Sequence, residues 1–380
     1  MGNLGVSGGN GLERLPGNSR EVLERLLKDL ESRESVVGVG LFGSWSRGDA
    51  SLSSDVDLLI VDGRDFNYEY VERAELENVF LDLDYVPAKW VLRQIPPEID
   101  QKLFEAQVLF DRNGKFTVAK NLMAKNYYSL ERAEMRIGDY VMQSDIYLSR
   151  VVAALNRNDF QSAKVSAVFS LAAVMRILLE VARKPYSNSR YLRMLESATI
   201  RLGKNEFYED YLDMAGLNRL SKQDTDGMLG SVSDMWQNVV SFVEDNSSKI
   251  ESIHVKVKND LNYYCRESFL KGMQTRANTL INDSLYEEAA HYLFRASISM
   301  LENYVWLLST LKGERFDFTY LFQRLKNSGL SHPDIYERAV DAFDLEDVSQ
   351  SEAEDAFKKA KEIVLEIRQK RNDYVASFES

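Results

Sequence analysis

Two aspartates separated by one residue, Asp55 and Asp57, stand at the start of an apolar run in the segment GLFGSWSRGDASLSSDVDLLIV, residues 40–61. On a β-strand, residues i and i+2 point to the same face, about 6.5–7 Å apart along the chain. Two carboxylates on one face repel each other unless a cation lies between them. Mg²⁺ prefers such oxygen ligands and keeps positions for water and phosphate. The apolar surroundings predict a buried strand, so the pair indicates a metal site rather than solvated charges.

A second pair of acids with the same spacing, Asp82 and Asp84, lies in the later run FLDLDYVP. If this run is a neighbouring strand, one of the two acids faces Asp55 and Asp57. Two metal ions about 3.5–4 Å apart stabilise the attacking and the leaving oxygen of a displacement at phosphorus. We therefore expect three carboxylates around two Mg²⁺ ions, with Mn²⁺ as the alternative ion.

A phosphate-binding turn is expected directly before this region. Gly43 and Ser44 follow an apolar run and open a short helix, so their backbone N–H groups and the Ser44 hydroxyl can meet a phosphate. Glycine fits because a side chain there would keep the phosphate out. Arg47, one turn later, can neutralise phosphate charge. The alternative is that Arg47 is a surface residue with an ion-pair partner.

The elements that position these residues can be read from hydrophobic periodicity. The first 115 residues or so predict a small α/β domain. We expect strands at 36–42, 55–62 and 79–86, and helices from residue 18, at 69–78 and near 96–105, followed by the run 106–114 with a turn at its end.

The stretch GSWSRGDASLSSDVDLLIV, residues 43–61, resembles the signature of the nucleotidyltransferase superfamily, which includes polymerase-β-like, aminoglycoside and minimal nucleotidyltransferases. The family pattern is an apolar strand, Gly-Ser, a polar segment, Asp-x-Asp on a strand and a later acid in an apolar strand. Each part is present between residues 20 and 120 or so. The resemblance implies that Asp55, Asp57 and a third acid bind the metal ions. It favours Asp82 over Asp84, because family members place that acid early in the strand.

The same resemblance implies that the triphosphate is held by Gly43, Ser44, Arg47 and Ser54. It also implies an activity: transfer of a nucleoside monophosphate from a nucleoside triphosphate, with ATP as the expected nucleotide, to an acceptor hydroxyl. Asp82 would help to deprotonate that hydroxyl, and pyrophosphate would leave. The expected acceptor is a small molecule or a protein. The alternative function is a non-catalytic nucleotide-binding regulator, or an antitoxin-like partner protein.

From about residue 117 onward, apolar residues recur at helical spacing and predict an almost wholly helical region. Its segment from Asp159 resembles that from Leu285, 126 residues later (285 − 159), and the segment from Tyr208 resembles that from Tyr336, 128 residues later (336 − 208). Because the two pairs of similar segments follow each other in the same order and at similar offsets, they predict a duplicated helical unit. The alternative is that amphipathic helices resemble each other by composition alone.

The predicted fold class is therefore α+β, a small mixed-sheet domain followed by an all-α region. The expected parts are a flexible tail at 1–17, the nucleotidyltransferase domain at 18–118, and helical bundles at 119–247 and 248–380. The bundles resemble helical partner domains of the HEPN type. Ribonucleases of that type carry an arginine followed shortly by a histidine, and neither Arg368 nor Arg371 has one after it.

Composition narrows the class of protein. A net charge of −12 and a pI near 5.0 argue against nucleic acid as the partner, which would need a basic surface. The single cysteine, Cys265, cannot form an internal disulfide. The most apolar stretch, residues 165–181, is interrupted by Ser170 and Arg176, so no membrane span is expected. The expected location is the cytoplasm, and no pattern indicates an oligomeric state.

Overall fold

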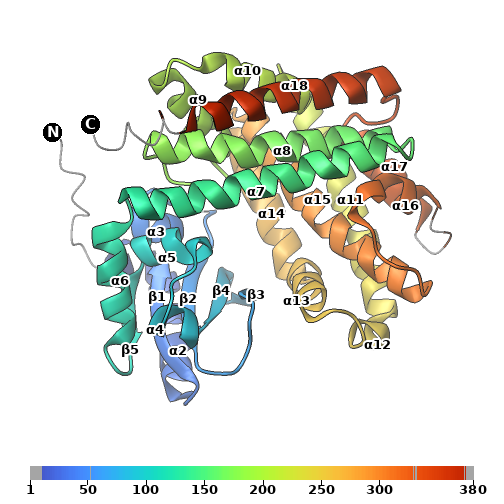
Figure 1. Ribbon diagram of the computed structural model, residues 1–380. Helices are drawn as coiled ribbons and strands as arrows, with labels where there is room; N and C mark the ends of the chain where they lie inside the picture. The colour runs from blue at the N-terminus through green and yellow to red at the C-terminus, as the bar shows by residue number, and fades with distance from the viewer. Residues whose placement is uncertain (1–10, 52, 328, 330–331, 372, 374–380) are drawn as a thin grey trace. The chain divides into compact units, whose positions relative to one another are not determined.

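The computed structural model describes residues 11–51, 53–327, 329, 332–371 and 373 (Figure 1). The chain forms two compact units. The first comprises the residues up to Ser129 together with Asn262–Gly272, and the second comprises Leu130–Leu261 and Met273–Ser380. A five-stranded mixed sheet lies in the first unit and helices make up the second, which confirms the α+β class. Most of the predicted tail at 1–17 falls outside the described residues, and the division into bundles at 119–247 and 248–380 stays a prediction.

The sheet has the strand order β3-β4-β2-β1-β5. β2 and β4 pair in parallel, and the other neighbours are antiparallel. The predicted strands at 36–42, 55–62 and 79–86 are confirmed within one residue at each end. The strands are β1 (Val36–Phe42), β2 (Val56–Asp62), β3 (Tyr70–Leu76), β4 (Val79–Pro87) and β5 (Gln107–Asp111).

The helix predicted at 69–78 is wrong, because this segment forms β3 and the turn into β4. Glu77 and Asn78 both have positive φ, 52° and 63°, as the two central residues of a type I′ hairpin turn do. The glutamates favour a helix by intrinsic propensity, but pairing with β4 outweighs that preference. As a result Arg73 lies on the sheet, directly opposite Asp82.

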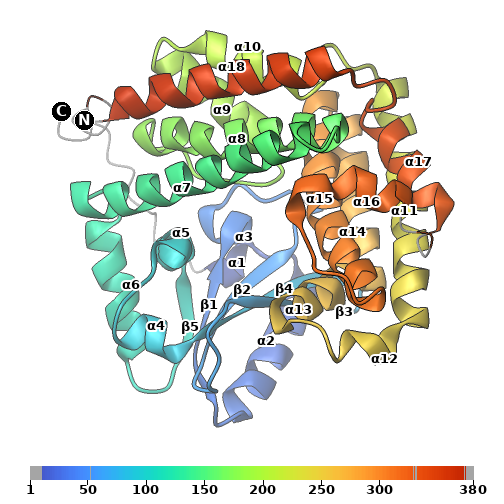
Figure 2. The same ribbon diagram turned by 45° about the vertical axis from the view of Figure 1, so that its right-hand side comes forward.

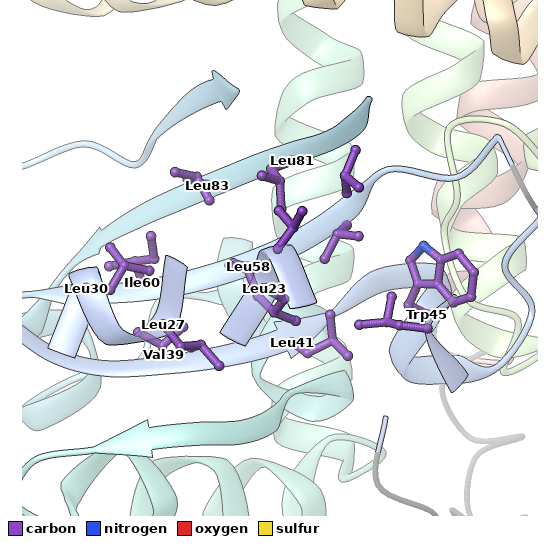
Figure 3. Close-up of a cluster of buried hydrophobic side chains, with 14 of the residues drawn as sticks. Leu23, Leu27, Leu30, Val39, Leu41, Trp45, Leu58, Ile60, Leu81 and Leu83 are labelled. Atoms are coloured by element: carbon purple, nitrogen blue, oxygen red, sulfur yellow. The ribbon is translucent and has the colours of Figure 1, made fainter. Parts of the chain in front are cut away.

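One face of the sheet packs against α2 (Gly17–Ser32), whose buried residues repeat at helical spacing. Figure 3 shows Leu23, Leu27 and Leu30 of α2 against the strands, with Trp45 at the end of the cluster. The strand residues of this core include Val39, Leu41, Leu58, Ile60, Leu81 and Leu83. The residues that pack on α2 are apolar, and Asp57, Asp82 and Asp84 alternate with them along the strands and point to the opposite face.

The opposite face is covered by α4 (Ala88–Leu92), α5 (Asp100–Glu105) and α6 (Lys115–Asn126). Their core contacts centre on Leu59, Val61 and Val86 of the sheet. The first unit also contains α1 (Gly11–Arg14), α3 (Gly43–Arg47) and η1 (Pro97–Ile99). The apolar contacts end near Phe42, and the polar candidate residues begin there.

The second unit is helical. Its helices, two of which begin or end in the first unit, are α7 (Leu130–Leu155), α8 (Phe160–Val181), α9 (Tyr191–Arg201), α10 (Asn205–Met214), α11 (Lys222–Asp245), α12 (Ser247–Ile250), α13 (Val255–Tyr264), α14 (Glu267–Asn282), α15 (Tyr286–Leu311), η2 (Phe318–Tyr320), α16 (Leu321–Asn327), α17 (Pro333–Ala342) and α18 (Gln350–Gln369). Figures 1 and 2 both show α7, α8 and α18 side by side. By length and composition alone α8 could cross a membrane, but 89% of its most apolar window is buried, as in a core helix.

Several local features recur in this unit at the offset expected for a duplication. Capping boxes begin α11 at Ser221 and α18 at Ser349, 128 residues later (349 − 221). Asn158 before α8 and Ser284 before α15 both have a φ of 59°. In the proposed duplication α8 corresponds to α15 and α11 corresponds to α18. The packing follows the same correspondence, because α11 packs on α15 and α18 packs on α8. These recurrences support the proposed duplication.

A fully buried histidine lies in this unit. His291 Nε2 is 2.8 Å from the Tyr211 hydroxyl, and its ring stacks on Tyr191 with centroids 4.8 Å apart. Burial, with a smaller contribution from Arg295, lowers the pKa of His291 well below its usual value. The folded protein therefore keeps His291 neutral at a pH at which the unfolded chain protonates it. Stability is consequently lost as the pH falls below about 6.5, the pKa of an unperturbed histidine.

We expect His291→Gln to weaken this pH dependence. Between about pH 7.5 and 5.5, the loss in free energy of unfolding should shrink by about 1.4 kcal/mol, because one proton no longer binds preferentially to the unfolded chain. Urea titrations at the two pH values measure this difference. His254→Gln is the control, since His254 is exposed. An unchanged pH dependence in the His291 variant would contradict the assignment.

Candidate active site

The parallel pairing of β2 with β4 places Asp57 directly opposite Asp82. Paired residues project to the same face of a sheet, so the two carboxylates lie on the face opposite α2. Asp55 stands one residue before β2, two positions from Asp57, and is 7% exposed. The register thus brings two of the predicted acids together, and Asp55 joins them through the contact described next.

Arg73 of β3 links the acidic residues. Its Nη2 donates to Asp55 Oδ1 and its Nη1 to Asp82 Oδ1, both at 2.9 Å. The Arg73 side chain is 3% exposed. Burial alone would lower the pKa of Arg73, but Asp82 and Asp55 outweigh it and raise that pKa. Removing one partner of a buried ion pair costs about 3–5 kcal/mol, so Arg73 is a main reason that these carboxylates can be buried together.

Residues 262–272, which belong to the same compact unit, complete the surroundings of this ion pair. The Tyr263 hydroxyl donates to Asp82 Oδ2 at 3.3 Å, and burial followed by the Asp82 charge raises the pKa of Tyr263 well above its usual value. Gly272 lies so close to Arg73 that an added Cβ would stand 2.2 Å from Nη2. Both oxygens of Asp82 therefore have a donor, Arg73 on one side and Tyr263 on the other.

Asp84, the second choice for the third acid, belongs to a separate ion-pair group. Lys102 Nζ lies 2.6 Å from Asp84 Oδ2 and also contacts Glu69. Burial would lower the pKa of Lys102, but Asp84 and Glu69 outweigh it and raise that pKa. Asp84 lies opposite Leu59, two positions along β4 from Asp82. This arrangement supports Asp82 as the acid that accompanies Asp57.

The donors predicted to bind phosphate hold a carboxylate of the chain instead. The Gly43 N–H donates to Glu105 Oε2 at 3.1 Å, and Arg47 Nη1 donates to the same oxygen at 2.7 Å. The Glu105 side chain is 5% exposed and lies at the end of α5. Burial would lower the pKa of Arg47, but Glu105 and Asp49 raise it. Arg47 is thus a mostly buried ion-pair residue, and Glu105 marks a position that receives an anion.

The remaining predicted residues form the turn and loop around this position. Ser44 accepts two backbone N–H donors, from Gly48 and Asp49, at its carbonyl oxygen. Ser54 Oγ accepts the Ser51 N–H at 2.9 Å, and the Ser54 carbonyl accepts Trp45 Nε1 at 3.3 Å. Ser44 and Ser54 therefore hold the described part of the loop before β2.

The structure gives a reason for glycine at position 43 that differs from the predicted one. Its φ is 71°, and an added Cβ would lie 2.2 Å from Asp57 Oδ2. The space that a side chain would fill is therefore taken by the Asp57 carboxylate rather than kept open for a phosphate. Glycine at this position allows β1 to turn while Asp57 approaches the turn.

The donor set suits a divalent ion in type and strand position, because three carboxylates meet at one end of β2 and β4. In the present arrangement Arg73 holds two of their oxygens. Across the residues that the structure describes, no three acidic, histidine or cysteine side chains are arranged as they stand to hold a metal ion.

Comparison with known proteins finds a family model that covers the sheet residues of this site. Residues 23–113 match the nucleotidyltransferase domain family model. These residues are a nucleotidyltransferase domain. A solved structure, a nucleotidyltransferase-like protein from Exiguobacterium sibiricum 255-15, is similar at 12% identity over 86% of this chain and 88% of its own, with a TM-score of 0.31. No curated protein matches the chain.

Three residues of the site were not predicted from the sequence. Arg73 lies in a segment whose glutamates favour a helix, and the hairpin turn at 77–78 is the signal in the sequence that sets Arg73 opposite Asp82. Glu105 and Tyr263 come from distant segments and carry no local signal.

We expect Gly43→Ala to destabilise the protein far more than Gly114→Ala. Both glycines have positive φ, 71° and 75°, but an added Cβ at Gly114 meets nothing within 4 Å in the described structure. The Gly114 variant should lose about 1–2 kcal/mol from backbone strain alone, and the Gly43 variant should lose at least about 2 kcal/mol more because Asp57 must move. Urea unfolding measures both. Equal losses would mean that Asp57 does not occupy the space beside Gly43.

Proposed function

We propose that the nucleotidyltransferase domain moves a nucleoside monophosphate from a nucleoside triphosphate, ATP by expectation, to the hydroxyl of an acceptor. The main support is the register of β2 and β4, which sets Asp57 opposite Asp82 next to the Gly43 turn. Domains of this family act on nucleoside triphosphates. Gly43 lies next to both groups, since its N–H donates to Glu105 Oε2 and an added Cβ would stand 2.2 Å from Asp57 Oδ2.

In the proposed reaction, the acceptor oxygen forms a bond to the α-phosphorus, and the bond from that phosphorus to the bridging oxygen breaks. Pyrophosphate leaves, and Asp82 accepts the proton of the acceptor hydroxyl. Asp55, Asp57 and Asp82 would hold Mg²⁺, or Mn²⁺, which when bound neutralises charge on the phosphates. Gly43, Ser44, Arg47 and Ser54 would contact the triphosphate, with Arg47 turning from Glu105 to the phosphate.

The acceptor is proposed to be a small hydroxylated molecule or a side chain of a protein. A net charge of −12 disfavours a nucleic acid, whose phosphates such a chain would repel. Location in the cytoplasm, where nucleoside triphosphates are available, remains part of the proposal.

A second candidate function is a nucleotide-binding regulator without transferase activity. One observation favours it: the chain's own groups occupy both halves of the site, Arg73 on Asp55 and Asp82, and Glu105 on the Gly43 N–H and Arg47. A regulator would bind the nucleotide and release no pyrophosphate. Calorimetry with each of the four nucleotides and Mg²⁺, followed by a pyrophosphate-release assay over a panel of acceptors, separates the two functions.

We expect Asp57→Asn to reduce pyrophosphate release by at least about 100-fold, because a transition-state charge contact is lost. Asp62→Asn, at the other end of β2 and paired with Arg64, is the matched control and should retain activity. Circular dichroism checks that both variants fold. If the Asp57 variant keeps the wild-type rate, Asp57 has no part in the reaction.

We expect Glu105→Gln to bind ATP roughly tenfold more tightly than the wild type, about 1.4 kcal/mol. The reason is that a phosphate must replace the Glu105 carboxylate on the Gly43 N–H and Arg47, and a neutral amide is easier to replace. Calorimetry measures the affinity, with exposed Glu98→Gln as the control. Equal or weaker binding by the Glu105 variant would show that phosphate does not enter this position.

A further inference from the structure

The acidic cluster already contains a cation of the protein's own. Arg73 reaches across β4 and bonds Asp55 Oδ1 and Asp82 Oδ1 at 2.9 Å each. These are oxygens that a metal ion at this site would need. A second cation beside the buried guanidinium would be repelled by its charge, so a divalent ion on these oxygens and the present position of Arg73 oppose each other.

The segment 262–272 keeps Arg73 in this position. Gly272 leaves no room for the guanidinium to shift in its direction, since even a methyl group there would be 2.2 Å from Nη2. Tyr263 donates to the second oxygen of Asp82 at 3.3 Å. Phe80 lies against the guanidinium, with its ring centroid 5.1 Å from Cζ.

Arg73 is not fully satisfied in this position. Its buried Nε–H group has no hydrogen-bond acceptor within the described part of the chain. An unpaired buried donor costs free energy, about 1–3 kcal/mol in proteins. The guanidinium is thus held by two bonds while a third donor is left without a partner, which makes its withdrawal less costly than that of a fully bonded arginine.

We propose that Arg73 is an internal competitor of the divalent metal ion, so that the site binds the ion only when the Arg73 guanidinium leaves Asp55 and Asp82. The proposal deepens the proposed function, on which it rests for the role of these carboxylates. Apparent metal affinity is then the intrinsic affinity multiplied by the fraction of molecules in which Arg73 has withdrawn. Any change that loosens Arg73 without altering the carboxylates should tighten metal binding.

The test is a titration with Mn²⁺ alone, in the absence of nucleotide, followed by electron paramagnetic resonance of the unbound ion. We compare the wild type with Gly272→Ala, Arg73→Lys and Arg73→Gln. Gly272→Ala keeps every charge and displaces the guanidinium, and Arg73→Lys keeps the charge but cannot bridge both carboxylates. Gly227→Ala is the matched control, a helical glycine whose added Cβ meets nothing within 4 Å in the described structure.

We expect Gly272→Ala and Arg73→Lys to bind Mn²⁺ at least about fivefold more tightly than the wild type, and Arg73→Gln at least about tenfold, as removal of a competitor predicts. Gly227→Ala should bind within about twofold of the wild type. Addition of Mg²⁺ to the ¹⁵N-labelled wild type should also move the Arg73 Nη resonances, whose N–H groups bond Asp55 and Asp82, toward those of an arginine without an ion-pair partner.

Three results would overturn the proposal. In the first, only Arg73→Gln binds Mn²⁺ more tightly than the wild type. The loss of a nearby positive charge would explain this result without any competition between Arg73 and the ion for the carboxylate oxygens. In the second, the Arg73 variants bind Mn²⁺ more weakly than the wild type, which would mean that Arg73 favours binding of the ion. The third is a site that binds no Mn²⁺ in any variant. If Arg73→Gln does not fold, Gly272→Ala and Arg73→Lys still decide between these results.

The readout separates this proposal from the proposed function. Mn²⁺ binding and the Arg73 resonances involve no nucleotide and no acceptor. A wild type that transfers no nucleotide yet shows the competition would refute the transferase alone. A wild type that transfers nucleotide while Gly272→Ala and Arg73→Lys bind Mn²⁺ as it does would refute the competition alone.

Discussion

Repulsion between carboxylates buried on one face of the sheet is the constraint on which the nucleotidyltransferase domain depends. Three sets of carboxylates on or beside this face each have a cation from a different element. Arg73 neutralises Asp55 and Asp82, Lys102 neutralises Asp84 and Glu69, and Arg47 neutralises Glu105 and Asp49. Because buried charges are costly without partners, these pairs fix where β3, α3 and α5 can lie against β2 and β4. The same ion pairs therefore stabilise the fold and surround the proposed site.

The strands and their acids were predictable because local pattern decides them. Val36–Phe42 and Val79–Pro87 are apolar runs that end at turns, and the spacing of Asp55 and Asp57 alone sets their common face. The ion pairs were not predictable, since they join segments far apart in sequence through the strand register. Arg73 illustrates the difference, because its neighbours suggest a helix and only the pairing with β4 gives it a role.

In the helical unit, the local features can be read from the sequence but the packing cannot. The features that recur between its two halves are mainly local, such as the capping boxes at Ser221 and Ser349. Its packing is not local, because α11 and α18 each lie against helices of the other half. A proposed duplication with exchanged last helices explains why the two halves form one compact unit and bury a residue as polar as His291 between them.

The first unit takes its last eleven residues, Asn262–Gly272, from far down the chain. During translation the sheet emerges well before them, since 132 residues separate Ser129 from Asn262 (262 − 129 − 1). At roughly 5–20 residues per second, the ribosome needs on the order of 7–26 s to make the intervening segment. For that interval the nascent chain carries its carboxylates and Arg73 without Tyr263 and Gly272, so the newly made domain meets cellular ions in a form that the finished protein no longer presents.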